Sequence, residues 1–136
     1  MMRITITPAD LNSEFVRQVE ELSGQNLAAC YQCGKCSAGC PAVDEMDILP
    51  NQLIRLVQLV REEGLADKNT AWLCATCLSC AARCPRGVSV SKIAEAVRAI
   101  ALRKGDDRIG VTQLPKEVLD SVPQQGLVSA MRKLTT

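Results

Sequence analysis

The sequence predicts an all-α protein organised around two cysteine-rich loops. Apolar residues recur at the spacing of an amphipathic helix in three separate segments. Two cysteine runs of identical spacing are each followed by one of these segments, so loop and helix form an internal repeat. The chain between the runs carries one helical pattern in place of short paired strands, which argues against a small β-rich fold.

The first expected helix precedes both cysteine runs. Thr7 can cap it, Pro8 suits its first position and Gly24 can end it. One face of this helix carries the apolar residues Leu11, Phe15, Val19 and Leu22. Residues 3–6 are too few for more than an edge strand or an extended N-terminal arm.

A longer helix is expected after each cysteine run. The second helix covers residues 50–64, and a short helix over residues 69–73 leads into the second run. The third long helix is capped by Ser89 or Ser91 and ends at Gly105. The inward positions are Leu53, Leu56, Val57 and Val60 in the second helix, and Val90, Ile93, Ala94, Val97, Ile100 and Ala101 in the third.

Past the third helix the apolar periodicity weakens. Two short helices are expected over residues 115–122 and 127–134, joined by a Pro-Gln-Gln-Gly turn. The chain is therefore divided into an N-terminal arm and helix (1–24), a cysteine-rich domain (25–105) and a C-terminal tail (106–136). We expect the tail to dock onto another protein of a complex, with a disordered tail as the alternative.

Both cysteine runs have the pattern C-x2-C-x2-C-x3-C-P, the spacing of bacterial proteins that bind [4Fe–4S] clusters. They comprise Cys30, Cys33, Cys36 and Cys40 before Pro41, and Cys74, Cys77, Cys80 and Cys84 before Pro85. Three closely spaced cysteines can wrap one corner of a cubane, whereas the fourth leaves the loop and ligates the other cluster in two-cluster ferredoxins. The expected ligand sets are therefore Cys30, Cys33, Cys36 and Cys84 for cluster 1, and Cys74, Cys77, Cys80 and Cys40 for cluster 2.

Disulfides and structural zinc are the rival interpretations of eight cysteines. Disulfides need an oxidising compartment, and the first 23 residues show no apolar segment typical of a signal peptide. A zinc site usually pairs two C-x2-C knuckles, whereas here four cysteines crowd into each run. A Rieske centre is excluded because it needs histidine and the chain has none.

Length and charge narrow the classes of partner. A chain of 136 residues suits one domain with tails, and a net charge of +1 favours neither nucleic acid nor an anionic membrane as partner. No apolar stretch is long enough for a transmembrane segment. Thiolates that hold clusters need a reducing compartment, so a cytoplasmic location is expected.

The residues around the cysteines resemble those of the heterodisulfide reductase C-subunit family (HdrC). The resemblance runs through residues 30–41, 46–52, 72–77 and 83–88. It implies an α-helical ferredoxin domain with two [4Fe–4S] clusters, similar to that of succinate dehydrogenase iron–sulfur subunits. It also implies electron transfer between a flavin- and iron–sulfur-containing A subunit (HdrA-like) and a catalytic B subunit with CCG domains (HdrB-like).

The sequence favours an electron carrier over a catalyst. It lacks histidine, a CCG pair, a G-x-G-x-x-G loop and any cysteine beyond those that two cubanes need. Lys35, Arg83 and Arg86 lie beside the cysteines, where positive charge would raise a cluster potential unless solvent screens it. The alternatives are a free soluble helical ferredoxin and a module with two four-cysteine zinc sites.

Overall fold

A computed structural model describes residues 13–59, 65, 67–105 and 107–135 of the chain. Within these ranges the regular elements are α-helices and short 3-10 turns, without strands, so the all-α prediction is confirmed. The chain divides into two compact units, Met1–Val97 and Arg98–Thr136, with the boundary inside helix α6 (Val90–Leu102). All the cysteines belong to the first unit.

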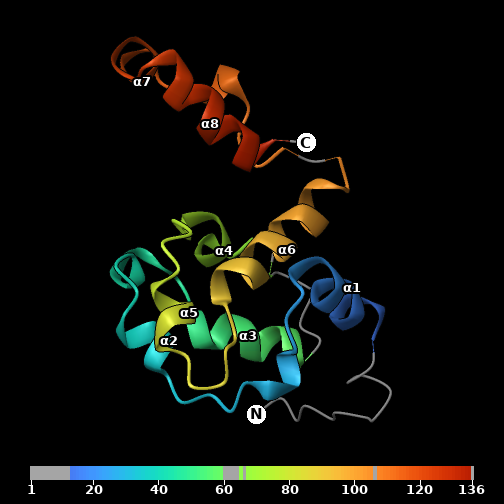
Figure 1. The fold of residues 1–136 in the computed structure, drawn as a ribbon. Helices are drawn as coiled ribbons and strands as arrows, with labels where there is room; N and C mark the ends of the chain where they lie inside the picture. The colour runs from blue at the N-terminus through green and yellow to red at the C-terminus, as the bar shows by residue number, and fades with distance from the viewer. Residues whose placement is uncertain (1–12, 60–64, 66, 106, 136) are drawn as a thin grey trace, which may run out of the picture. The chain divides into compact units, whose positions relative to one another are not determined.

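Helix α3 (Pro50–Gln58) is the centre of the first unit (Figure 1). It contacts α1 (Glu14–Ser23), α4 (Asn69–Leu73) and the 3-10 turn Leu27–Ala29. As the sequence predicts, the helix begins at Pro50, whose fixed φ suits a first helical position. The expected end at Gly64 lies outside the described residues.

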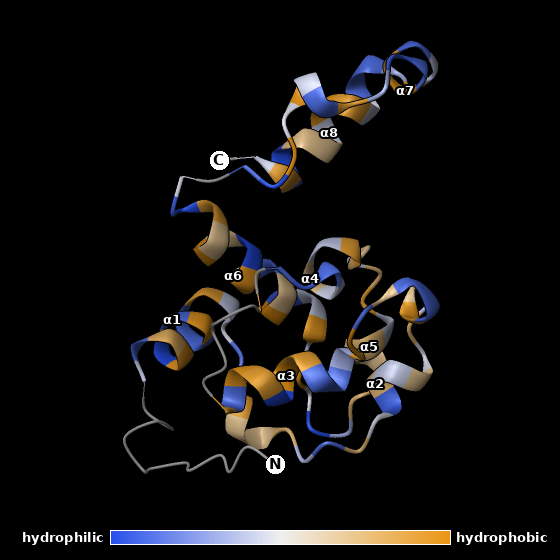
Figure 2. Cartoon of the chain, turned by 180° about the vertical axis from the view of Figure 1, so that it is seen from behind, coloured by the Kyte–Doolittle hydropathy of each residue, from blue (hydrophilic) through white to orange (hydrophobic). Residues whose placement is uncertain are grey.

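The apolar face of α3 is rotated slightly from the one that the sequence predicts. Leu53, Ile54 and Val57 are buried, whereas Leu56 is only half-buried. The predicted apolar face included Leu56 and left out Ile54, whereas Ile54 is the more buried of the two in the structure. Figure 2 shows hydrophobic and hydrophilic residues alternating along α1, α3 and α8, as amphipathic helices require.

Helix α1 follows Ser13, whose Oγ accepts a hydrogen bond from the N–H of Val16 at 3.3 Å. The expected start at Thr7 and the N-terminal arm lie outside the described residues. Gly24 ends the helix in the left-handed conformation, as predicted. On the apolar face predicted for this helix, Phe15 and Val19 are buried, whereas Leu22 is 40% exposed.

Each cysteine run forms a loop that leads into a short helix. These helices are α2 (Lys35–Ala38) and α5 (Ser79–Arg83), and they lie side by side near the N-terminal end of α3 (Figure 1). A 3-10 turn, Val43–Glu45, follows α2. Helix α6 starts at Val90 as expected, and the carbonyl of Ser89 accepts its first hydrogen bond from Ile93.

The second unit carries a 3-10 turn, Val111–Gln113, and helices α7 (Lys116–Ser121) and α8 (Gln124–Leu134). The turn was expected over residues 123–126, but residues 124–126 instead form the first turn of α8, because Pro123 precedes the helix with a φ of −56° that suits a helix entry. The N–H of Arg108 donates to the carbonyl of Leu134 at 2.8 Å and closes this unit. Among the described residues, no helix is long and apolar enough to cross a membrane.

Candidate functional site

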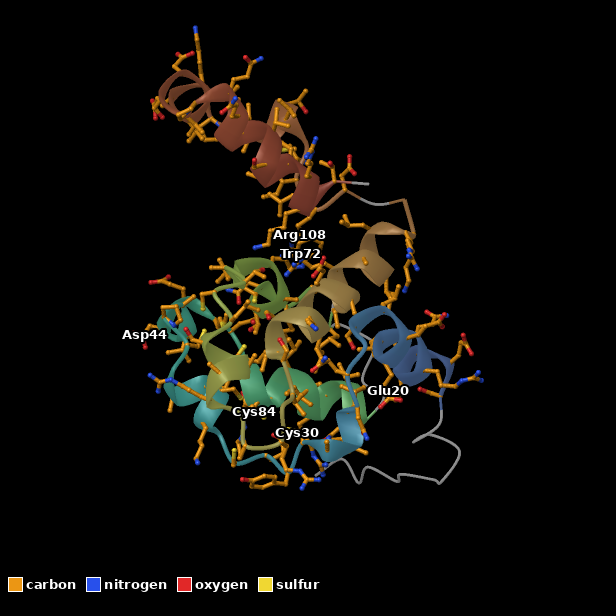
Figure 3. The ribbon with its side chains drawn as sticks, in the orientation of Figure 1. Glu20, Cys30, Asp44, Trp72, Cys84 and Arg108 are labelled. Carbon is orange, nitrogen blue, oxygen red and sulfur yellow. The ribbon has the colours of Figure 1, made fainter. Side chains whose placement is uncertain are left out.

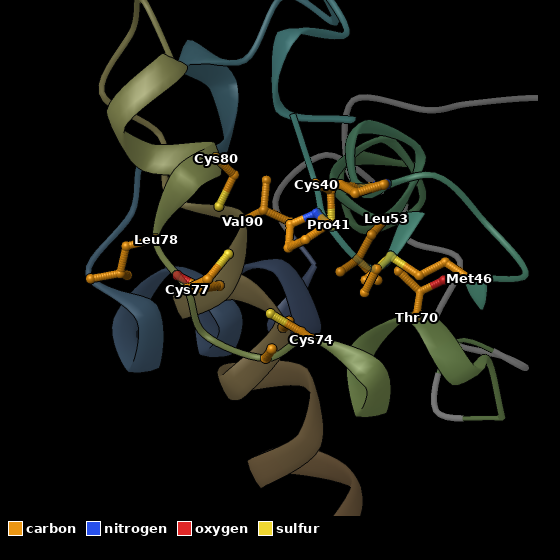
Figure 4. Close-up of a pocket in the computed structure, with 15 residues that line it drawn as sticks. Cys40, Pro41, Met46, Leu53, Thr70, Cys74, Cys77, Leu78, Cys80 and Val90 are labelled. Carbon is orange, nitrogen blue, oxygen red and sulfur yellow. The ribbon is translucent and has the colours of Figure 1, made fainter. Parts of the chain in front are cut away.

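Two cavities in the first unit are each lined by four cysteines, three from one run and one from the other. Site 1 is the cavity lined by Cys30, Cys33, Cys36 and Cys84. Site 2 is the cavity lined by Cys40, Cys74, Cys77 and Cys80, and Figure 4 shows their side chains around a shared space. These are the two sets that the spacing predicts as ligands.

The packing of α2 against α5 explains why the last cysteine of each run lines the cavity formed by the other run. Cys40 follows α2 and Cys84 follows α5, so each leaves the loop that carries its own first three cysteines. Because the two short helices are neighbours, Cys40 lines site 2 and Cys84 lines site 1. Figure 3 labels Cys84 and Cys30, which come from different runs and line the same cavity.

Gly39 allows a close approach between the two loops. A Cβ atom at this position would lie 2.5 Å from the Cδ and Nε atoms of Arg83. The Arg83 side chain therefore occupies the space that any larger residue would need, directly before Cys40. The sequence showed small residues here but could not show that an arginine from the other run covers one of them.

Left-handed residues flank the second cysteine of each loop. In the first loop Gln32 has φ 63° and Gly34 has φ 78°, and in the second loop Thr76 has φ 55° and Leu78 has φ 61°. Alternation of right- and left-handed residues turns successive backbone N–H groups toward one concave side, an arrangement found at phosphate and iron–sulfur sites. Both loops are therefore shaped to receive an anionic group.

Hydrogen bonds reach the cysteine sulfurs at both sites. At site 1, the Gln32 amide donates to Cys30 Sγ at 3.4 Å and the Val88 N–H donates to Cys84 Sγ at 3.3 Å. At site 2, Cys77 Sγ lies 3.5 Å from Ser79 Oγ, and hydrogen bonds from Ser79 lower the pKa of the Cys77 thiol. Burial raises the pKa of Cys36 at site 1, against the opposing effect of hydrogen bonds from Ser37.

A polar relay holds the first loop against α3. Ser37 Oγ donates to Asn51 Oδ1 at 2.6 Å and accepts from the Asn51 N–H at 3.0 Å. The Asn51 side-chain amide then donates to Gln32 Oε1 at 3.3 Å, and Gln32 in turn donates to the sulfur of Cys30. Further along α3, Gln58 donates to the carbonyls of Leu27 and Cys30. These contacts fix the entry of the loop and one of its sulfurs.

Asp47 caps helix α4 from a distant loop. Its carboxylate accepts hydrogen bonds from the N–H of Asn69 at 3.1 Å, the N–H of Thr70 at 3.2 Å and the Thr70 hydroxyl at 2.8 Å. Desolvation opposes ionisation, but these hydrogen bonds outweigh it and lower the pKa of Asp47 below its ordinary value. Because Thr70 lines site 2, this cap anchors the wall of that cavity.

The two sites are adjacent, since Val90 lines both cavities. In a zinc site four sulfurs lie about 2.3 Å from a single ion. Within the described part of the chain, no three Cys, His, Asp or Glu side chains are grouped closely enough to hold one metal ion. The four cysteines of each site line a cavity between the two loops.

Comparison with known proteins identifies the class of domain that contains the cysteines. Residues 26–88 match the family described as a 4Fe-4S dicluster domain. This range contains all eight cysteines, and their side chains line the two cavities. Residues 26–88 therefore form a dicluster domain that is all-α in its described part, and its cofactors are two [4Fe–4S] clusters.

The relatives within this class are C subunits of heterodisulfide reductases. The chain is 32% identical to the iron-sulfur C subunit of the CoB–CoM heterodisulfide reductase of Methanopyrus kandleri, over 74% of this chain and 56% of the relative. It is 33% identical to a second-copy C subunit of this reductase from Methanocaldococcus jannaschii, over 71% of this chain and 56% of the relative. It is also 33% identical to the C subunit of the ferredoxin:CoB-CoM heterodisulfide reductase of Methanosarcina mazei, over 68% of this chain and 57% of the relative.

The chain spans a little over half the length of these curated relatives. It is a homologue of the heterodisulfide reductase C subunits, so the resemblance expected from the residues around the cysteines is confirmed.

Proposed function

We propose that this chain is an electron-transfer subunit of a heterodisulfide-reductase-type complex and relays single electrons through two clusters. The observation that carries the proposal is the pair of adjacent four-cysteine cavities that share Val90 as a wall. A bound [4Fe–4S] cubane supplies a reversible one-electron couple. Two such couples in neighbouring cavities would make a short path through the domain.

The ligand sets follow the cavities. Cys30, Cys33, Cys36 and Cys84 would hold the cluster of site 1, and Cys74, Cys77, Cys80 and Cys40 that of site 2. The thiolates would bind the irons, the left-handed loops would turn N–H groups toward the anionic clusters, and the apolar wall of site 2 would limit access of water to its cluster. With every cysteine committed as a ligand, the chain would carry electrons and leave substrate chemistry to another protein of the complex.

The proposed partners are two subunits of different chemistry. One is an A-type subunit with flavin and iron–sulfur clusters, and the other is a B-type catalytic subunit with CCG domains. The relatives, which are named as C subunits of heterodisulfide reductases, support this assembly. A cytoplasmic location is part of the proposal, because ligand thiolates survive best in a reducing compartment.

Purification of the native protein tests the proposal. The chain is isolated without oxygen from its own cells, and the co-purifying proteins are identified together with bound flavin. The proposal predicts a stable complex with a flavoprotein and a protein containing CCG domains. Recovery of the chain alone, with clusters that reduce and reoxidise, would instead indicate a free carrier.

A further inference from the structure

The two sites have the same cysteine spacing but different walls. Site 1 is lined by two cationic side chains, Lys35 and Arg86, and by the amides of Gln32 and Asn51. Among the described residues that line site 2, none is charged, and most are apolar, including Met46 and other aliphatic side chains. The internal repeat therefore gives two cavities that differ in their local charge.

Acidic residues add to this difference on the side of site 2. The segment after Cys40 supplies Met46 to the wall of site 2 and carries Asp44, Glu45 and Asp47. Asp47 is hydrogen-bonded to Thr70, which also lines site 2. Asp47 therefore places a carboxylate next to the wall of site 2, and the charge of nearby Lys68 offsets part of it.

Arg83 is a cation common to both sites. It directly precedes Cys84, which lines site 1, and its side chain lies against Gly39, which precedes Cys40 of site 2. Its charge therefore acts on both cavities and does little to separate them. The difference between the sites depends on Lys35 and Arg86 on one side and on the acidic segment on the other.

Reduction of a cluster adds one negative charge, so its potential depends on the charge and polarity around it. Cations near the cluster stabilise the reduced form and raise the potential, whereas carboxylates and an apolar wall lower it. Lys35 and Arg86 are exposed to solvent and are partly screened, which limits the size of the effect and leaves its sign unchanged.

We propose that the two clusters have unequal potentials, with the cluster of site 1 reduced first, and that Lys35 and Arg86 set this order. The inference rests on the proposed function, because it assumes a redox-active cluster in each cavity. One electron arriving in the domain would then settle at site 1. Transfer to site 2 would occur when a second electron or a bound partner raises the free energy of the electron at site 1.

A redox titration of the intact, cluster-loaded protein tests this order. The two cluster signals are followed by electron paramagnetic resonance as the potential is lowered stepwise. Lys35→Gln and Arg86→Gln should move the higher midpoint to a more negative value and leave the lower one nearly unchanged. Asp44→Asn with Glu45→Gln should move the lower midpoint to a less negative value.

The matched control is Lys116→Gln, which removes the same charge from an exposed position in α7 that lines neither cavity. It should move neither midpoint. Equal midpoints in the wild type, or a larger shift of the lower midpoint in Lys35→Gln and Arg86→Gln, would overturn the inference. Protein without two redox-active clusters would instead overturn the proposed function, so the two failures are distinguishable.

Discussion

Leu78 holds a left-handed backbone conformation, with φ 61°, at the position where the first loop has Gly34. A side chain with a Cβ atom is disfavoured there by about 1–2 kcal/mol, whereas glycine is not. Leu78 is also 51% exposed, so burial offsets little of this strain. The repeat therefore keeps the same backbone in both loops with a strained residue at this position in only one.

Replacement of these two residues should have opposite effects. Leu78→Gly relieves the strain but adds flexibility to the unfolded chain, so we expect a gain of about 0.5 kcal/mol in stability. Gly34→Ala introduces the strain into the first loop and should cost about 1 kcal/mol. Denaturant unfolding of the cluster-loaded variants without oxygen measures both, and a more stable Gly34→Ala would contradict this account.

The last cysteine of each run gives the sharpest test of the crossed ligand sets. Cys40→Ser should remove the cluster of site 2 and leave a spectrum like that of Cys77→Ser. Cys84→Ser should remove the cluster of site 1 and leave a spectrum like that of Cys33→Ser. Electron paramagnetic resonance of the four reduced variants makes the comparison. Pairing of Cys40→Ser with Cys33→Ser would show that each run holds its own cluster.

At the residue scale, the sequence grouped the cysteines but gave little information about the residues around them. The spacing grouped the cysteines into the same two sets of four that line the two cavities, and their role as cluster ligands stays a prediction. It could not identify the left-handed Leu78 or the contact of Arg83 with Gly39. The contact of Arg83 with Gly39 depends on the packing of α2 against α5, which joins segments far apart in the chain.

At the scale of elements, the cap of α4 by Asp47 joins the two halves of the internal repeat. The sequence predicted a helix over residues 69–73, but the carboxylate that accepts its first N–H groups comes from the loop before α3. A contact over such a sequence distance leaves no periodic signal. Helix starts and stops with local signals, such as Pro50 and Gly24, were predicted correctly.

Loss of this cap should destabilise the domain. Asp47→Ala removes the acceptor for the first N–H groups of α4 and should cost about 1 kcal/mol at neutral pH. Asp44→Ala, in the same loop but without a helix to cap, is the matched control and should change stability little. Denaturant unfolding at pH 7 compares them, and equal losses would rule out a specific role for Asp47.

The same pair of variants tests the sign of the pH dependence. The pKa of Asp47 is lowered in the folded state, so its contribution is complete above the ordinary carboxyl pKa. It is lost as the pH falls through the lowered value. The stability difference between wild type and Asp47→Ala should therefore be constant near neutrality and shrink in acid. A difference that grew in acid would contradict the hydrogen bonds assigned to this carboxylate.

At the scale of the whole molecule, the second unit carries apolar side chains that its own packing leaves exposed. Val118 in α7 and Val128 in α8 are 39% and 49% exposed, and neither helix has a buried residue. The predicted docking role of the C-terminal tail stays a proposal. It agrees with the exposure of the apolar side chains of Val118 and Val128 in these helices.

Charged residues at these positions should weaken assembly without affecting the clusters. The double variant Val118→Asp and Val128→Asp should keep its iron content and stability, since exposed substitutions usually change stability by about 0.5 kcal/mol or less. It should co-purify with smaller amounts of the partner proteins than wild type. Lys116→Asp, also exposed in α7, is the control that changes charge without removing an apolar side chain. Undiminished co-purification of the double variant would exclude docking through Val118 and Val128.

The content of iron, acid-labile sulfide and zinc in the anaerobically purified native protein tests the central claim most directly. Two clusters held by the chain's eight cysteines require about eight irons and about eight sulfides per chain, with no stoichiometric zinc. About two zincs per chain and no sulfide would contradict it. The two cavities would then be structural sites, and the electron-transfer function built on them would have to be abandoned.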